Sequence, residues 1–390
     1  MVALLFVTLG TLNPRFLTLS NLEAVSLQIA EIGLVAIPMA FVIMSGSIDF
    51  SVGSVASVSA IVFAMVASST QSVALGMAAG LAMGLGAGAV NGFLVAFANL
   101  NPLVITLGFL NVWGGVALFL NNGSTVTGLP PVSRDIAQFT LFGVPTSILV
   151  LIAAVVVSWV VLAKRPFGRH LLAVGGNPTA AHIMGLSVRG VRMRLFLVSG
   201  LGAAVAGMLL AMKLQAAPPT LGSGMELTAL TVVLLGGVAF EGGYGKISGV
   251  VAGLLFVGAL RNGLVLLGVS QFLQTVVVGL TLVAAISLDK TVQGTLRSAW
   301  TGGAGRKPPA GGGQRTSQGA SQGADAVQPA TSAGAGQGTS QRTSQGAGQG
   351  ASQGADAVQP ATSAGAGAGA GARPISQTAA PKGETVAAGW

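Results

Sequence analysis

Four carboxylates lie within or beside long apolar stretches of this sequence: Glu31, Asp49, Glu226 and Glu241. A charge buried in hydrocarbon is costly and usually serves binding, proton transfer or ion movement. Each of the four also suits a position at a membrane–water interface. The residue types alone therefore leave a functional and an interfacial position equally open.

Other groups that do chemistry are scarce. The chain has no cysteine, which excludes disulfides, thiolate metal sites and a cysteine nucleophile. Its two histidines, His170 and His182, lie in one basic segment, so no apolar stretch offers an imidazole for acid–base chemistry or metal binding. This pattern disfavours an intramembrane hydrolase.

A phosphate-binding loop is also missing. The nearest match, Gly245-Lys246, is followed by Ile247 instead of serine or threonine, and Phe240 stands where the first glycine should be. If ATP drives a process in which this chain takes part, another polypeptide must hydrolyse it.

The segment from Gly175 to Gly185 has the sequence of one short, capped helix. Asn177 suits the N-cap, Pro178 the first helical position, and Gly185 the left-handed residue after the end. Three apolar residues share one face, at spacings of three and four: Ala180, Ile183 and Met184. Docking into a groove on another subunit and packing against the ends of its own helices are both compatible with this spacing.

The elements that carry these residues are apolar. The chain is 52% apolar and 7% charged, which is too apolar for an ordinary soluble domain. A membrane-spanning helix needs about 20 mostly apolar residues. Nine stretches are predicted to span: 27–46, 52–70, 73–98, 103–120, 146–163, 195–213, 227–240, 247–265 and 269–288. Four glycines of the third stretch recur every four residues, a spacing typical of close helix packing: Gly76, Gly80, Gly84 and Gly88.

The first residues form a partial stretch. Residues 1–12 are apolar but would reach only about 18 Å as a helix, and they lack the basic leader and cleavage site of a signal peptide. We interpret them as a truncated first helix. The predicted fold is therefore all-α, a polytopic transmembrane helical bundle of about ten spans.

Basic residues predict the orientation. Six lie between residues 164 and 194 without an acidic residue: Lys164, Arg165, Arg169, Arg189, Arg192 and Arg194. Short loops rich in lysine and arginine are cytoplasmic, and four predicted spans follow, so the C-terminus is expected in the cytoplasm too. The net charge of +9 is thus attributed to orientation, and no nucleic-acid partner is expected.

The composition changes sharply near residue 290. Residues 1–290 form the predicted transmembrane domain, and 291–390 a tail rich in Gly, Ala, Ser and Gln. The sixteen residues 321–336 recur unchanged at 352–367. Such a segment has too little apolar surface to offset its ordering entropy, so the tail is predicted to be disordered.

Four blocks together resemble the ribose-type sugar ABC transporter permeases, along nearly all of residues 1–290. They are residues 37–54, with Ser47-Ile48-Asp49-Phe50-Ser51-Val52-Gly53; Asn91-Gly92 with Pro102–Gly108; Gly175–Gly185; and Pro219–Leu264, with Glu226-Leu227, Gly236-Gly237, Gly242-Gly243 and Asn262-Gly263. The chain departs from the family at Thr179 and Thr228, where acidic residues are usual, at Gly114, where arginine is common, and at Phe50, where leucine is usual.

The resemblance implies a complex of two permease copies, alike or related, in the bacterial inner membrane with cytoplasmic ABC ATPase subunits and an extracytoplasmic solute-binding protein. ATP and magnesium would be bound by the ATPase, and no cofactor or metal by this chain. It implies coupling to the ATPase through Gly175, Gly176, Asn177, Ala180, Ala181, Ile183, Met184 and Gly185. Residues expected near the translocation path or its gates are Asp49, Asn91, Thr106, Glu226 and Asn262.

The expected function is import of a monosaccharide such as ribose or xylose by alternating access, without enzymatic activity in this chain. An ion-coupled secondary transporter of a small polar solute is the main alternative, because it too would place carboxylates within the membrane. A membrane enzyme is the second alternative, and the lack of cysteine and intramembrane histidine argues against it.

Overall fold

The structure, a computed structural model, describes the backbone of residues 2–303 and the side chains of residues 2–287. Its elements in chain order are α1 (Val2–Leu12), the 3-10 helix η1 (Pro14–Leu17), α2 (Leu19–Met44), α3 (Val52–Thr70), α4 (Val73–Ala96), α5 (Pro102–Leu120), α6 (Pro131–Gln138), β1 (Thr140–Leu141), β2 (Val144–Pro145), α7 (Thr146–Lys164), α8 (Pro166–Gly176), α9 (Pro178–Ile183), α10 (Val188–Leu214), α11 (Met225–Leu235), α12 (Ile247–Leu266) and α13 (Gln271–Gly303). The predicted all-α fold is confirmed. The two short strands form a single antiparallel hairpin.

Among the described residues, seven helices are long and apolar enough to cross a membrane: α2, α3, α4, α5, α7, α10 and α12. Three shorter apolar helices, α1, α11 and residues 271–287 of α13, coincide with the remaining predicted stretches. The number of hydrophobic helices therefore agrees with the sequence, and the disagreement concerns their lengths.

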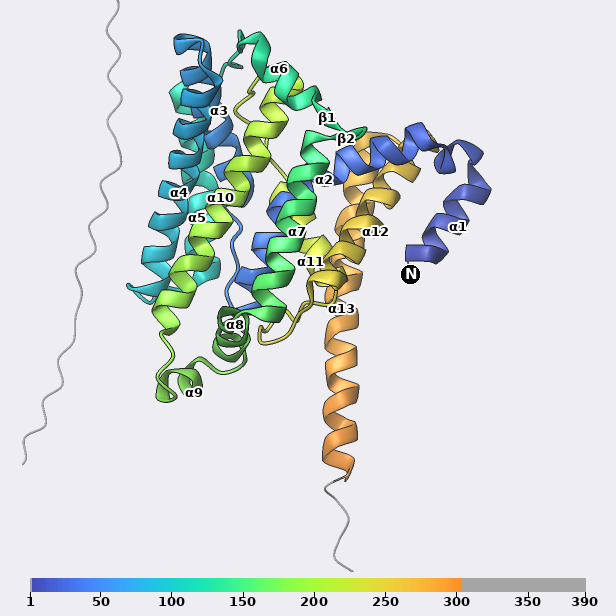
Figure 1. The fold of residues 1–390 in the computed structure, drawn as a ribbon. Helices are drawn as coiled ribbons and strands as arrows, with labels where there is room; N and C mark the ends of the chain where they lie inside the picture. Colours follow the sequence, from blue (N-terminus) through green and yellow to red (C-terminus); the bar gives the residue numbers. More distant parts are fainter. Residues whose placement is uncertain (1, 304–390) are drawn as a thin grey trace, which may run out of the picture. The chain divides into compact units, whose positions relative to one another are not determined.

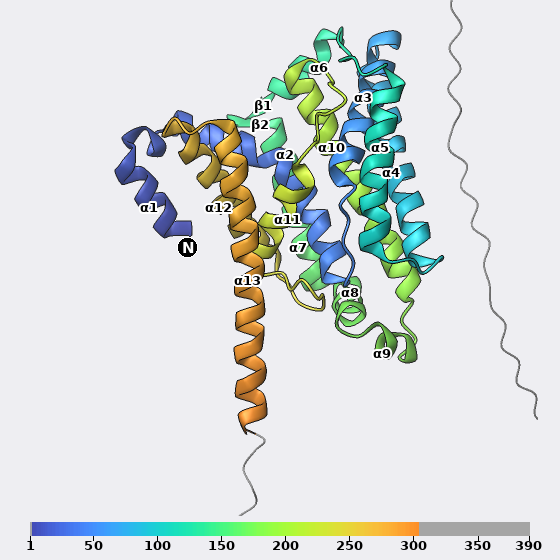
Figure 2. The same cartoon turned by 180° about the vertical axis from the view of Figure 1, so that it is seen from behind.

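The stretch 227–240 is not a full span. Helix α11 ends at Leu235, because Gly236 and Gly237 follow and Gly237 adopts φ +75°. A helix of this length reaches about 16 Å, well short of the hydrocarbon layer. Figure 2 shows the chain descending from the end of α10 to an α11 that begins inside the bundle. This part of the chain is therefore an interrupted helix.

The helices gather around α2. One group, α3, α4, α5 and α10, lies on one side of it, and α7, α11, α12 and α13 lie on the other (Figure 1). Every residue from Ile29 to Met44 of α2 is buried, as expected for a helix that is apolar on all faces. The core of the bundle is built on this helix.

The glycine stripe of α4 lets three helices approach closely. Gly76, Gly80, Gly84 and Gly88 are all buried. A Cβ atom on Gly84 would lie 2.5 Å from the Ala204 Cβ and 2.6 Å from the Gly200 carbonyl oxygen of α10. The stripe therefore serves helix packing, as predicted.

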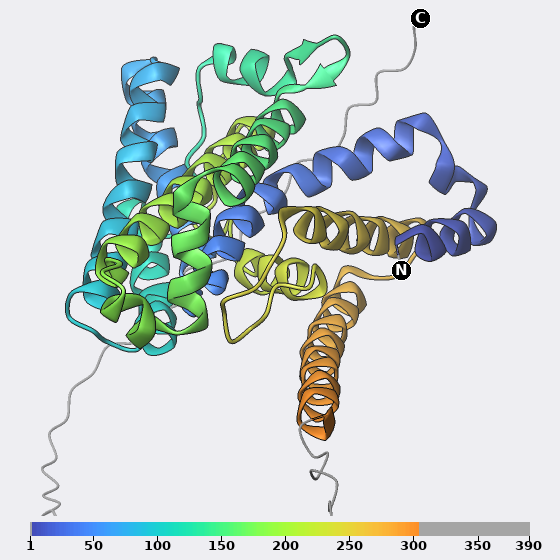
Figure 3. The same cartoon turned by 60° about the horizontal axis from the view of Figure 1, so that its bottom comes forward.

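The two ends of the bundle carry different elements. Helices α8 and α9 lie at the same end as the C-terminal end of α13, and α6 and the hairpin lie at the other (Figures 1 and 3). Helix α10 begins at Val188, earlier than predicted, so Arg189, Arg192 and Arg194 lie on its first turns. The basic segment 164–194 is thus mostly helical and gathered at one end.

Helix α13 extends beyond the predicted domain boundary at residue 290. Its backbone stays helical through Gly303, and the first proline after this helix is Pro308. Residues 291–303 are therefore helical where the sequence predicted the start of a disordered tail. The repeat at 321–336 and 352–367 lies outside the described residues.

Candidate functional site

A non-helical segment interrupts the bundle between α2 and α3. Helix α2 ends at Met44, and Gly46 then adopts φ +74°, a conformation that glycine accepts without strain. Asp49 forms a local turn in which its Oδ1 accepts hydrogen bonds from the backbone N–H of Ser51 (3.0 Å) and from the Ser51 hydroxyl (2.6 Å). Residues 45–51, here called the Asp49 loop, end where α3 begins.

The Asp49 carboxylate is buried and fully engaged. It is 2% exposed, and its Oδ2 accepts a hydrogen bond of 2.7 Å from the Ser199 hydroxyl of α10. Its three donors are thus two hydroxyls and a backbone N–H, a set that satisfies a buried carboxylate without a cation. The carboxylate joins the Asp49 loop to the middle of α10.

Asn91 and Thr106 hold the same loop from α4 and α5. Asn91 Nδ2 donates to the Ser51 hydroxyl at 2.7 Å, and its Oδ1 accepts from Trp113 Nε1 at 3.4 Å. Thr106 Oγ1 donates to the carbonyl oxygen of Pro102 at 2.8 Å and lies 3.3 Å from that of Ile48 in the loop. The structure therefore brings Asp49, Asn91 and Thr106 together around one loop.

Glu226 lies at the N-terminus of α11, against the start of α3. Its Oε1 accepts from the Gly224 N–H at 3.1 Å, whereas its buried Oε2 has no partner among the described residues. Gly53, the second residue of α3, provides the space for that oxygen, because a Cβ there would collide with it. Glu226 is thus adjacent to the beginning of α3, which directly follows the Asp49 loop.

Asn262 does not join this group. Its side chain exchanges two hydrogen bonds, of 2.9 Å and 3.0 Å, with Asn21 of α2, and Asn21 also donates to the Phe16 carbonyl oxygen. The pair fastens α12 to the beginning of α2. Sequence reasoning grouped Asn262 with Asp49 because both stand in recognisable blocks, and the sequence contained no sign of its partner.

Sequence reasoning did not predict two residues of the Asp49 network, Ser51 and Ser199. Ser51 carries a local signal, because a serine two residues after an aspartate commonly bonds to it in a turn. Ser199 carries none, because it meets Asp49 from a position 150 residues away.

Helix α9 carries the predicted caps. Asn177 Oδ1 accepts from the Ala180 N–H at 2.9 Å, and Gly185 adopts φ +81°. Ile183 is 81% and Met184 69% exposed, whereas Ala181 is buried beneath them. Two apolar side chains therefore project from the end of the bundle.

Glycine contacts connect α8, which precedes α9, to the Asp49 loop. The Gly243 N–H donates to the Met44 carbonyl oxygen at 2.8 Å. A Cβ on Gly175 would collide with that same oxygen and lie 2.6 Å from the Gly243 nitrogen. A Cβ atom on Gly242 would lie 2.6 Å from the Gly46 nitrogen. We call this three-way backbone contact the glycine junction: Met44, Gly46, Gly175, Gly242 and Gly243.

The comparisons with known proteins identify the family of the chain. The family profile described as the branched-chain amino acid transport system / permease component matches residues 21–286. The chain is 40% identical over 291 residues to the ribose import permease protein RbsC of Bacillus subtilis (strain 168), a match that covers 74% of this chain and 90% of that protein.

Two further relatives come from Escherichia coli (strain K12). The L-arabinose transport system permease protein AraH is 37% identical over 76% of this chain and 90% of its own length. The D-allose transport system permease protein AlsC is 31% identical over 75% and 90%. No solved structure matches the chain. The chain belongs to the ribose-type family of monosaccharide ABC transporter permeases.

Proposed function

We propose that this chain is the membrane-spanning subunit of a bacterial ABC importer and translocates a pentose such as ribose or xylose, or a related monosaccharide. The names of its relatives support this class, since they specify ribose, L-arabinose and D-allose. The structural observation that carries the proposal is an exposed apolar helix, α9, joined through α8 and backbone contacts to the loop that holds a buried carboxylate.

Helix α9 is proposed to dock on the ATPase subunit. Ile183 and Met184 expose apolar surface at the end of the bundle, which suits insertion into a groove on a partner. In this proposal the ATPase binds ATP and magnesium, and this chain supplies no phosphate-binding loop. The end that bears α8, α9 and the C-terminal end of α13 is then cytoplasmic, which agrees with its basic residues (Figure 3).

The glycine junction is proposed to transmit movement into the bundle. Gly175 of α8 contacts the last turn of α2 and Gly243, and no side chain lies between them. A displacement of α8 would therefore move the end of α2 and the segment that contains Gly243. The Asp49 loop starts at that point and is bonded to α10, α4 and α5. Movement at the ATPase would thereby rearrange the helices around the loop.

Asp49, Asn91, Thr106 and Glu226 are proposed to line or gate the path, since they cluster at an interrupted part of the bundle. Asn262 is proposed to hold the opposite end through Asn21. A solute-binding protein would deliver sugar at that end, and a second permease copy, identical or related, would complete the path.

An ion-coupled secondary transporter remains the second candidate. The buried Asp49 and the interrupted α11 favour it, because such transporters place carboxylates and broken helices within the membrane. It makes a distinct prediction: the chain alone would concentrate sugar when a proton or sodium gradient is imposed.

One reconstitution separates the two. The chain is placed in liposomes alone, or with its ABC ATPase and solute-binding protein, and uptake of labelled D-ribose, D-xylose and L-arabinose is measured. If the chain belongs to an importer, sugar uptake requires both partners and ATP. The rate of uptake does not change when a proton or sodium gradient is imposed. Uptake by the chain alone under a gradient would instead establish the secondary transporter.

A further inference from the structure

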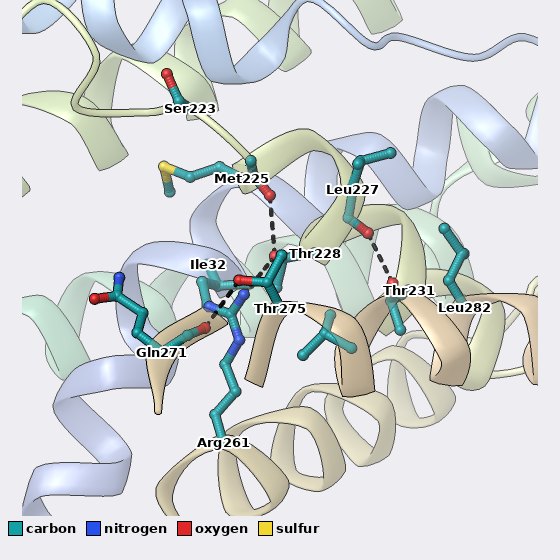
Figure 4. A pocket seen from close by; sticks show the side chains of 13 residues that line it. Ile32, Ser223, Met225, Leu227, Thr228, Thr231, Arg261, Gln271, Thr275 and Leu282 are labelled. Atoms are coloured by element: carbon teal, nitrogen blue, oxygen red, sulfur yellow. Dashed lines mark hydrogen bonds between the residues drawn. The ribbon is translucent and has the colours of Figure 1, made fainter. Parts of the chain in front are cut away.

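A pocket of about 320 Å³ lies between α2, α11, α12 and α13, apart from the Asp49 loop. Six polar residues from different segments of the chain line it, namely Ser223, Thr228, Thr231, Arg261, Gln271 and Thr275, and Figure 4 shows the Arg261 guanidinium beside Thr228 and Thr275. Ligand pockets are commonly about 300–1,000 Å³, so this volume suits a small solute. Apolar residues such as Ile32 and Leu282 complete the wall.

Arg261 is the single charged residue of this lining. It lies on α12, one of the helices long and apolar enough to cross a membrane. Its Nη2 donates to the Thr228 hydroxyl at 3.0 Å, and within the described part of the chain no carboxylate forms an ion pair with it. A guanidinium has five N–H donors, so donors remain for a ligand in the pocket. An ionisable group in this position generally serves a function.

The threonine hydroxyls present acceptors. Thr228 and Thr275 donate their hydrogens to the carbonyl oxygens of Gly224 and Gln271, at 3.0 and 3.1 Å, whereas Thr231 is fully buried and bonded to the Leu227 carbonyl oxygen. The Thr228 and Thr275 hydroxyl oxygens then keep lone pairs to receive a hydrogen bond, and Thr228 already accepts one from Arg261. The wall therefore combines a guanidinium that only donates with hydroxyls poised to accept.

That combination matches a solute with several hydroxyl groups, because each hydroxyl both donates and accepts. We propose that the pocket is a binding subsite for a small polyhydroxylated solute, with Arg261 donating to adjacent oxygen atoms of the ligand. An aldose and the corresponding sugar acid share this chemistry, and a carboxylate would pair with Arg261 as well.

The position of the pocket connects it with the proposed path. Ser223 and Gly224 line it, and Glu226, two residues further on, lies against the start of α3. The subsite thus rests on the proposed sugar permease function and specifies where the solute is held within this chain.

A thiol-protection experiment tests the subsite directly, because the chain has no cysteine of its own. Thr275→Cys places a thiol in the pocket wall, and Thr281→Cys is a matched control on α13 outside the lining. Both threonines donate to the carbonyl oxygen four residues earlier, so the two substitutions disturb α13 alike. The full-length variants are labelled in membranes with N-ethylmaleimide.

We expect D-ribose, L-arabinose or D-ribonate at millimolar concentration to slow labelling of Thr275→Cys and to leave Thr281→Cys unchanged. Tetramethylammonium, a solute with neither hydroxyl nor carboxylate groups, should protect neither variant. Comparison of the aldoses with D-ribonate identifies which form of the ligand the pocket takes. Absence of protection by both aldoses and by D-ribonate, or equal protection of both variants, would overturn the proposal.

Transport provides the second measurement. In the reconstituted complex, Arg261→Gln should lower uptake roughly tenfold or more, the usual effect of losing hydrogen bonds from a charged group. Hydrolysis of ATP stimulated by the loaded binding protein should persist, which a merely structural role for Arg261 would not allow. The exposed Arg15→Gln is the matched control.

The two hypotheses fail differently. If wild-type complexes take up no sugar, the proposed function is wrong. If they do, and Arg261→Gln either transports like Arg15→Gln or loses stimulated ATP hydrolysis together with uptake, the subsite is wrong.

Discussion

At the scale of single residues, Asp49 is a buried carboxylate held from two sides. Its carboxylate receives three hydrogen bonds, from two groups of its own loop and from Ser199 of α10. A buried carboxylate that loses a donor retains its desolvation cost without the compensating bond. The stability of the bundle therefore depends on hydroxyls that look unremarkable in the sequence.

Ser199→Ala is expected to lower the free energy of unfolding by roughly 1–3 kcal/mol, because Asp49 Oδ2 loses its donor in a buried site. Thermal unfolding of the detergent-solubilised chain measures this change. Ser69→Ala on α3 is the control, since that hydroxyl is exposed and bonds only to a carbonyl of its own helix. Equal stability of the two variants would show that the bond to Asp49 contributes little.

At the scale of elements, the short helices outside the spans determine what the bundle offers to a partner. Helix α9 is held by its Asn177 cap and by buried Ala181, and it leaves Ile183 and Met184 uncovered. Helix α8 is fixed by backbone contacts that require glycine. One element thus offers the surface and its neighbour carries any displacement inward.

Ile183→Glu should abolish copurification with the ATPase subunit, because a charge replaces the most exposed apolar side chain of α9. The side chain is 81% exposed, so the free energy of unfolding should change by less than about 0.5 kcal/mol. Val132→Glu, on α6 at the other end of the bundle, is the matched control and should copurify normally. Retention of the ATPase by Ile183→Glu would argue against docking through α9.

The glycine junction offers a comparison of two adjacent residues. Gly175→Ala forces a Cβ onto the Met44 carbonyl oxygen and should cost roughly 1–3 kcal/mol of stability together with most uptake. Gly176→Ala occupies the same end of α8, but the nearest atom to its Cβ is 4.0 Å away, so its free energy of unfolding should stay close to that of the wild type. Helix propensity changes equally in both, and melting temperature with ATP-driven uptake measures the difference. Similar behaviour of the two variants would rule out tight packing at the junction.

At the scale of the whole molecule, the family match and the apolar helices coincide. The profile covers residues 21–286, and the helices long enough to span lie between Leu19 and Leu266. The matched part contains the Asp49 loop, α8, α9 and the Arg261 pocket. The proposed transport machinery therefore lies within the part of the chain that the relatives share.

A chain ending at Gly303 is accordingly expected to assemble with its partners and to support uptake at the rate of the full chain. The composition of residues 304–390, poor in bulky apolar side chains, gives them little surface for stable packing. Uptake by the reconstituted shortened complex is the measurement. Loss of transport, with assembly intact, would assign the tail a direct part in the cycle.

The sequence by itself determined the elements that local patterns encode. Long apolar stretches predicted the hydrophobic helices, and Asn177 with Gly185 predicted the ends of α9, because helix length and capping depend on neighbouring residues. Where a stretch was mostly apolar, as at 227–240, its hydropathy did not reveal that the two glycines end α11. Apolar composition reports burial and not helical continuity.

Only the tertiary structure decided which residues meet. It joined Asp49 to Ser199, separated Asn262 from both, and placed Gly175 against Met44 and Gly243. It also placed Arg261 beside Thr228 in a pocket that no motif marked. These contacts link residues far apart in the chain, and they depend on how the helices pack against one another. No local spacing or periodicity records that packing.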